Sequence, residues 1–294
     1  MALTPSFGSN VILELDGRPA GGLRSAQPAS LRVDMVARQA GPEVLVRRGT
    51  QVTLGEMAAE QLLTEAGPLT DWAAAVLGGD LSAHDGALLV TDMNHALRRR
   101  IGFREARLTA LTWSPLDARG GKLPLTLGLR WLATAVDDVA GDGATAKTIS
   151  KARKPLLAAN FRVGGLPFDE ATVASVDLPG LQMVWSAERG GLQRPASQTA
   201  RRQFGPLALT IAAARAAQAR AWVRKQVADG RIDEAEGLTL QVELLDATMK
   251  KVLASFTLGG CLLLGMDESA LGNDERAGEL VLRFDVGSVK FAFT

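Results

Sequence analysis

The sequence predicts a mostly β protein made of two similar halves, each with antiparallel strands and one main helix. Three observations predict this class: alternation of apolar and polar residues, one segment of helical periodicity in each half, and an ordered series of matches between the halves. Alternation with a period of two is typical of strands that bury one face. Such strands form an antiparallel β-sandwich or a small barrel with the helix packed alongside.

The alternation is clearest in the second part of the first half. Leu97, Ile101 and Phe103 share one face of a predicted strand, and Arg99 is the charged exception on that face. A turn follows at the glycine pair 120–121, where residues that tolerate positive φ are favoured. The next predicted strand places five apolar residues on one face: Leu123, Leu125, Leu127, Leu129 and Trp131.

Each half also contains a segment with helical spacing. In the second half, residues 207–227 are predicted as a helix, because four small or apolar residues share one face: Ala216, Ala219, Val223 and Val227. In the first half the predicted helix covers residues 58–76. Gly67 and Pro68 are expected to interrupt it, since proline breaks the backbone hydrogen-bond ladder.

The two halves match in order along the chain. Placing Phe103 on Phe256 without gaps brings Trp113 onto Met266. The same offset aligns Leu127, Leu129, Arg130 and Trp131 with Leu280, Leu282, Arg283 and Phe284. Upstream, with small shifts, the matched pairs are Asn10 with Asn160, Trp72 with Trp222 and Asp92 with Asp246. An ordered series of this kind predicts an internal duplication.

The domain boundary is expected near Gly143, which gives domains 1–143 and 144–294, the second being more divergent. Residues 135–154 are rich in small and polar side chains without strand or helix periodicity, which favours a linker.

Composition narrows the function classes. Lys and Arg number 33 against 32 Asp and Glu, so the net charge gives no support for nucleic-acid binding. A single cysteine allows no disulfide within the chain and no thiolate metal cluster, and two histidines argue against a multi-histidine metal site. The N-terminus lacks a signal-peptide pattern and no apolar run is long enough to span a membrane, so we expect assembly in the cytoplasm.

No motif predicts catalysis, a cofactor site or a metal site. The segment 141–148, GDGATAKT, nearly matches a phosphate-binding loop, but Ala146 replaces the second glycine that the backbone needs to wrap around phosphates. His95 near Asp92 fits a solvated turn, and Cys261 lies in an apolar context that keeps a thiol inert. We therefore expect a protein that is not an enzyme.

Aromatic residues are predicted to anchor the core rather than to bind a ligand. The predicted anchors are Trp72, Phe103, Trp113, Trp131, Trp222, Phe256 and Phe284.

With these residues identified, the first half resembles the tube protein family of contractile phage tails and related injection systems. The resemblance rests on NVILELDGRPAGGL from Asn10, on DWAAAVLGGD from Asp71, and on DMNHALRRRIGFREARLTALTW from Asp92 to Trp113 with the strand that closes at Trp131. It covers most of residues 7–135. Residues 156–294 resemble the family more weakly, since they lack the Arg-rich strand and carry Met266 in place of Trp113.

The resemblance implies a tail-tube-like β-sandwich or barrel that assembles into six-fold rings stacked around a lumen. Strand edges would pair between subunits, and the segments 37–51 and 186–203 would contact the next ring. The residues expected at contacts between subunits or rings are Arg47, Arg48, Arg99, Arg189, Arg201 and Arg202. No cofactor is implied.

Two domains in one chain allow two assemblies. Three chains would make a pseudo-six-fold ring, as in a tail hub, or six chains would form the ring with one domain decorating its exterior. The expected partners are further copies of the chain, neighbouring tube, hub, baseplate and sheath proteins, and DNA or effector cargo in the lumen. The alternative is a soluble two-domain module that binds a ligand or a protein without ring assembly.

Overall fold

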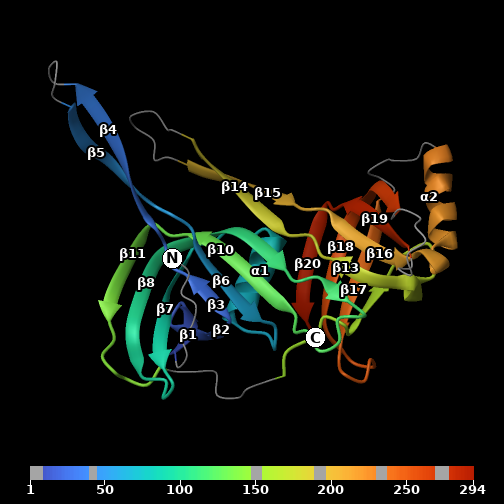
Figure 1. Ribbon diagram of the computed structural model, residues 1–294, viewed down its shortest axis with the longest axis horizontal. Coiled ribbons are helices and arrows are strands. Elements are labelled where there is room, and N and C mark those ends of the chain that lie inside the picture. Colours follow the sequence, from blue (N-terminus) through green and yellow to red (C-terminus); the bar gives the residue numbers. More distant parts are fainter. Residues whose placement is uncertain (1–8, 40–44, 147–153, 189–196, 230–236, 269–277) are drawn as a thin grey trace. The chain divides into compact units, whose positions relative to one another are not determined.

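The structure is a computed structural model that describes residues 9–39, 45–146, 154–188, 197–229, 237–268 and 278–294 (Figure 1). In these ranges the chain is mostly β-strand, with two α-helices and antiparallel strand pairing. The predicted fold class is confirmed. The chain divides into two compact units, which are described separately: unit 1 is Met1–Gln61, Leu81–Thr109 and Gly128–Lys151, and unit 2 is Leu62–Asp80, Ala110–Leu127 and Ala152–Thr294. The domain boundary expected near Gly143 stays a prediction.

The strands of the first half run β2-β1-β7-β8-β10-β6-β3, and β11 pairs with β8. A separate two-stranded sheet holds β4 and β5, which lie side by side as a long hairpin (Figure 1). The bounds are β1 Ser9–Leu15, β2 Arg18–Leu23, β3 Ser25–Gln27, β4 Leu31–Gln39, β5 Leu45–Leu54, β6 Met57–Leu62, β7 His84–Asp92, β8 Leu97–Trp113, β10 Thr126–Leu132 and β11 Ala135–Ala140.

The strands of the second half run β12-β17-β18-β19-β16-β13-β9, and β20 pairs with β18. Strands β14 and β15 form a second hairpin (Figure 1). The bounds are β9 Leu116–Asp117, β12 Phe161–Gly164, β13 Val173–Asp177, β14 Leu181–Glu188, β15 Ser197–Phe204, β16 Leu207–Ala212, β17 Leu238–Leu245, β18 Val252–Glu268, β19 Glu279–Asp285 and β20 Ser288–Phe293, with short 3-10 helices at Glu170–Thr172 and Ala213–Arg215.

The two strand orders correspond element by element, as a duplication requires. The order in the first half is β1-β7-β8-β10-β6-β3, and the equivalent order in the second half is β12-β17-β18-β19-β16-β13. In the same way, the pairing of β11 with β8 corresponds to that of β20 with β18. The central strands β8 and β18 are each 17 residues long, and each pairs with different neighbours along its two parts. One long strand therefore organises each repeat.

A bulge in each long strand sets the true alignment of the repeats. Glu105 and Gly260 both take positive φ, 48° and 64°, where the pairing register shifts. Beyond the shift, the first paired residue of β8 is Phe103, opposite Gly86, and the first paired residue of β18 is Leu258, opposite Leu240. The structural equivalent of Phe103 is thus Leu258, and the alignment of Phe103 with Phe256 was wrong by two residues. A shift of two keeps every side chain on its own face, so the residue pattern alone does not reveal it.

Helix α1 spans Pro68–Gly78, which is shorter than the predicted helix at 58–76. Pro68 occupies the first turn, where its missing N–H costs nothing, and Gly79 ends the helix with φ of 102°. The residues before it form strand β6 instead. The expected interruption at Gly67 and Pro68 is in fact the helix start.

Helix α2 spans Ala217–Asp229, and the predicted helix at 207–227 was wrong in its first part. Residues 207–212 form strand β16, which pairs with β13 and β19. A short apolar run fits a buried strand or a buried helix equally well by periodicity, and here the two neighbouring strands decide. Val227, predicted to lie on the apolar face, is 68% exposed.

Two further expectations differ from the structure. Residues 135–140 were assigned to the linker but form strand β11, whose side chains are mostly exposed, so its small and polar composition suits an outer strand. Leu123, predicted to lie on the apolar face of a strand, is 62% exposed because β10 begins only at Thr126.

Large side chains fill the core of each unit. In unit 1, Phe103 and Trp131 are buried and their rings lie 5.5 Å apart. In unit 2, Trp113 packs edge-on against Phe256 at 4.8 Å. Of the other predicted anchors, Trp72 and Phe284 are buried and Trp222 is half-buried. Aromatic pairs at these separations stabilise a core beyond the area that they bury.

Candidate assembly surfaces

The described residues contain no grouping of three or more His, Cys, Asp or Glu that could hold a metal ion. No helix among them is long and apolar enough to cross a membrane. Cys261 is buried, and burial raises the pKa of its thiol to about 11, so the thiol is unreactive at neutral pH. His84 Nδ1 lies 2.6 Å from Asp16 Oδ2, beside the turn between β1 and β2.

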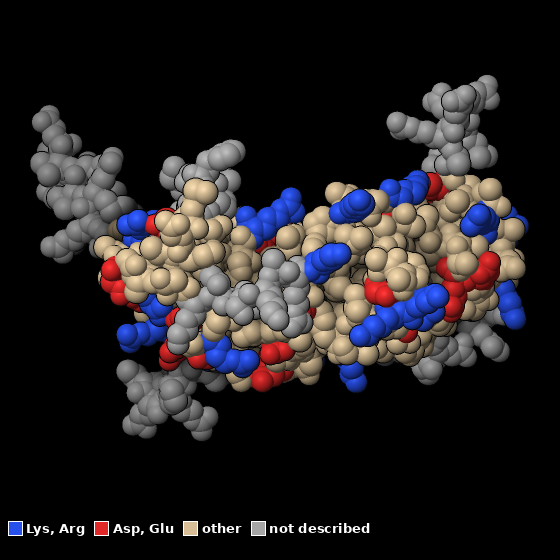
Figure 2. Space-filling model, turned by 90° about the horizontal axis from the view of Figure 1, so that it is seen from below, with Lys and Arg blue, Asp and Glu red and all other residues tan. Residues whose placement is uncertain are grey.

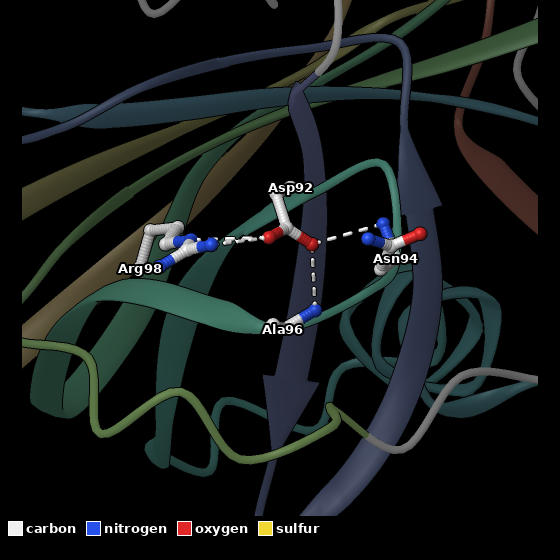
Figure 3. Close-up of polar contacts among 4 residues, drawn as sticks. All are labelled: Asp92, Asn94, Ala96 and Arg98. Carbon is white, nitrogen blue, oxygen red and sulfur yellow. Dashed lines mark hydrogen bonds and ion pairs between the residues drawn. The ribbon is translucent and has the colours of Figure 1, made fainter.

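Asp92 organises the turn that leads into β8 (Figure 3). Its Oδ1 accepts hydrogen bonds from the backbone N–H groups of Asn94 and Ala96, both at 2.9 Å, and its Oδ2 lies 2.7 Å from Arg98. These bonds, first that of Ala96 and then that of Arg98, lower the pKa of Asp92. His95 completes the turn with φ of 60°.

The same turn recurs before β18. Asp246 accepts hydrogen bonds from Thr248 and from the backbone N–H groups of Lys250 and Lys251, and these bonds lower its pKa. Met249 takes φ of 59°, in the place of His95. A histidine in one repeat and a methionine in the other serve the same turn, so the position needs a backbone conformation rather than an acid or a base.

The Arg98–Arg100 run is held by ion pairs within unit 1. Arg98 pairs with Asp92, Arg99 binds Asp138 through two nitrogens at 2.8 and 2.5 Å, and Arg100 pairs with Glu14 at 3.0 Å. The Arg99 guanidinium lowers the pKa of Asp138. On the face that Figure 2 shows, basic and acidic side chains are interspersed. Arg99 thus has a partner within its own chain.

The structure places the other predicted contact arginines as follows. Arg202 Nη1 donates to the Leu77 carbonyl at 2.8 Å, and Arg201 beside it is exposed. Arg47 and Arg48 lie in β5, but their side chains are outside the described structure, and Arg189 lies outside the described residues. Their roles at subunit or ring contacts stay predictions.

The bases of the two hairpins are equivalent with an offset of 150, from Leu31 to Asp34; beyond Asp34 the register of β4 with β5 shifts, and that of β14 with β15 does not. Leu31 pairs with Leu54 at the base of β4 and β5, and Leu181 pairs with Phe204 at the base of β14 and β15. The backbone N–H of Gly55 donates to Ser30, and that of Gly205 donates to Gly180, at 2.7 and 2.8 Å. The hairpin base is therefore the same local structure in both repeats.

Unit 2 contains pieces of the first half as well as Ala152–Thr294. The end of β8 pairs with β14 through Leu111 with Leu181 and Ala110 with Gln182. Strand β9 pairs with the outer edge of β13, and α1 packs against β20. Trp113 lies against Phe256 and Phe291. Strands and a helix of one repeat thus complete the sheets of the other.

Unit 2 also holds a pocket of about 630 Å³. Among its lining residues are Leu156, Leu245, Phe293 and Asp246, and no His, Cys or Ser. Asp246 is the carboxylate already engaged in its turn.

No family model matches the sequence, and no curated protein matches it. Several solved structures are similar to parts of the chain. A chain in the 6-fold symmetrised baseplate of the anti-feeding prophage is 16% identical, with a TM-score of 0.38, and the match covers 45% of this chain and 93% of that one. A chain in the extended sheath-tube complex of the PVC extracellular contractile injection system is 15% identical, with a TM-score of 0.40, over 44% and 88%. Hcp1 from Flavobacterium johnsoniae is 17% identical, with a TM-score of 0.29, over 45% and 96%.

Proposed function

We propose that this protein is a structural subunit of a phage-tail-like tube, or of the hub or adaptor beneath it. Its copies assemble into stacked rings around a lumen in a contractile tail or injection system. The role is mechanical rather than catalytic: the chain supplies strands that pair and hairpins that reach neighbouring copies.

The observation that carries this proposal is the make-up of unit 2. Its sheet edges at β13 and β14 are covered by β9 and β8, which belong to the other repeat. Uncovered sheet edges invite uncontrolled pairing, and a closed ring of repeats covers them all. A fold in which strands of one repeat pair with the sheet edges of the other is suited to a ring made of many repeats.

The duplication also supports the proposed symmetry. Three chains with two repeats each would give a pseudo-six-fold ring, which suits a hub between three-fold and six-fold parts. Six chains using one repeat each would leave six decorating domains. We favour three chains, because the contact within unit 2 already joins one repeat to the other. Neighbouring tube, baseplate and sheath proteins are the proposed partners, and DNA or an effector is the proposed cargo.

Light scattering and averaged electron micrographs of the purified protein test this function. Rings with three copies of the 31.0 kDa chain support the hub arrangement, and rings with six copies and outer lobes support decoration. A protein that stays monomeric at every concentration overturns the tube proposal and favours a soluble binding module.

A further inference from the structure

Equivalent positions in the two repeats differ sharply in exposure. Leu31 is 70% exposed and Val33 53%, whereas Leu181 and Met183, at the same places in the second hairpin, are 1% and 7% exposed. The strand pairing at these positions, near the hairpin base, is the same in both hairpins. The difference therefore arises from what covers each hairpin base.

The reverse contrast appears on elements of the second repeat. Val227 at the end of α2 is 68% exposed, while its equivalent Leu77 in α1 is 2% exposed. Leu264 lies where the register of β18 with β19 shifts and is 62% exposed, whereas Thr109, the same number of residues beyond the β8 bulge, is 8% exposed. Apolar side chains are thus left uncovered on both halves, at places whose equivalents are buried.

The covering elements of unit 2 explain the buried positions. The end of β8 covers the start of β14, β9 covers β13, and α1 lies on β20. In the described part of the first half, β4 pairs only with β5, and β3 pairs only with β6. Beyond Cys261, β18 has β19 on one edge and no described strand on the other. Within the described residues, the start of β4 thus has no strand on its outer edge, and the end of β18 has an edge that no strand occupies.

We propose that the end of β18 in one copy pairs with the start of β4 in a second copy, burying Leu264 of the first against Leu31 and Val33 of the second. The inference rests on the proposed function and specifies its lateral contact. Counting from the bulges at Glu105 and Gly260 gives the proposed register: Leu111 with Leu181 becomes Met266 with Leu31, and Ala110 with Gln182 becomes Gly265 with Arg32.

Charge on a second pair of elements supports the same contact. Because α1 packs on β20, the equivalent contact between copies brings α2 onto β11. Helix α2 carries exposed Arg224 and Lys225, and β11 carries exposed Asp137; the neighbouring Asp138 is already paired with Arg99. The apolar contact within unit 2 is thus replaced by a contact of opposite charges. Complementary charge of this kind favours the correct partner and orientation.

This contact joins two different surfaces, so each copy keeps one free surface after binding another. Such an interface builds a closed ring where the rotation closes and a filament where it does not. It also predicts what happens when one surface is removed from each of two copies.

The test mixes two variants, Leu31→Asp and Leu264→Asp. Both positions are exposed, so each variant should keep the wild-type melting temperature. Each alone should run in light scattering as a 31.0 kDa monomer under conditions where the wild type assembles. Mixed, they should form a dimer and nothing larger, because only one pair of intact surfaces remains. Met93→Asp, at a residue 76% exposed on the turn before β8, is the matched control and should assemble as the wild type does.

The outcomes separate this inference from the proposed function. Wild-type rings that persist in both variants overturn the inference and leave the ring function standing. Two variants that each form dimers alone indicate a symmetric interface and also overturn it. A wild type that never assembles overturns the function, and the inference falls with it.

A covalent test checks the register. Arg32→Cys together with Gly265→Cys places two thiols on residues that would face each other across copies. A side chain at Gly265 meets no atom within 4 Å, so the change fits the monomer. Mild oxidation of the assembled protein should give a ladder of disulfide-linked multimers. Arg32→Cys with Leu123→Cys is the control and should give none; equal ladders from both pairs contradict the register.

Discussion

Leu31 and Leu181 stand at the same place in two hairpins whose bases pair in the same way, yet one is 70% exposed and the other 1%. Leu181 lies opposite Leu111, which the first repeat supplies. The comparison shows that secondary structure is a property of each repeat, whereas burial at the hairpin base depends on the neighbouring repeat. The same substitution at the two positions should therefore change the free energy of unfolding by different amounts.

The largest contrast should come from Leu181→Asp against Leu31→Asp. A carboxylate at the buried position loses apolar packing and is itself desolvated, which should lower the free energy of unfolding by at least about 4 kcal/mol. At Leu31 the change in the monomer should stay within about 0.5 kcal/mol. Urea unfolding of both variants measures the difference, and equal losses would refute the assigned burial.

The second largest loss of stability should come from removing an aromatic side chain from the core of unit 1. Trp131→Ala and Phe103→Ala should each lower the free energy of unfolding by about 3 kcal/mol, because both side chains are buried and pack together. Trp222→Ala, at a half-buried position, should cost less. Unchanged melting temperatures for Trp131→Ala and Phe103→Ala would contradict their place in the core.

Substitutions at the bulges of β8 and β18 should differ in stability by a smaller amount. Gly260→Ala should lower the free energy of unfolding by about 1 kcal/mol, because its φ of 64° is strained for a residue with a Cβ atom. Glu105→Gly should cause no loss, since that position already holds a non-glycine residue at φ of 48°. Denaturant midpoints of the two variants compare them; losses of the same size in both would show that the two bulges are not equivalent.

The smallest effect should come from the carboxylate of the β8 turn. The pKa of Asp92 is lowered in the folded protein, so its ionised form stabilises the fold above the ordinary carboxyl value of 3.8. That stabilisation is lost as the pH falls through the lowered pKa. The difference in melting temperature between wild type and Asp92→Asn should be largest near about pH 6 and should shrink below about pH 4.

Asp246→Asn sharpens this comparison, because the pKa of Asp246 is lowered by an equivalent turn. Its melting temperature should follow the same dependence on pH. A difference from wild type that grows on acidification in either variant would contradict the turn geometry.

Much of the fold could be predicted from the sequence. The period-two pattern predicted β8 and β10, and the ordered matches predicted two repeats with the same strand order. What the pattern could not supply was the exact alignment of β8 with β18, since a shift of two residues leaves every face unchanged. The bulges at Glu105 and Gly260 set it, and they depend on pairing with β7 and β17.

The residue pattern bears less directly on the candidate surfaces. Arg99 is paired with Asp138 and Arg202 binds the Leu77 carbonyl, and the roles of the arginines at subunit contacts stay predictions. The exposed Leu31 and Val33 were missed. They alternate as an ordinary buried strand would, so the residues alone gave no sign that their face is uncovered.

The sequence by itself determined the class of fold, the repeat and the turns, because these depend on local periodicity and on residues that tolerate special backbone angles. Only the tertiary structure decided which helix and strands of one repeat complete the other, and which edges remain uncovered. Pairing between strands distant in the chain depends on how many edges are available and on where they lie. No local pattern of residues encodes that, and in this protein those edges carry the proposed function.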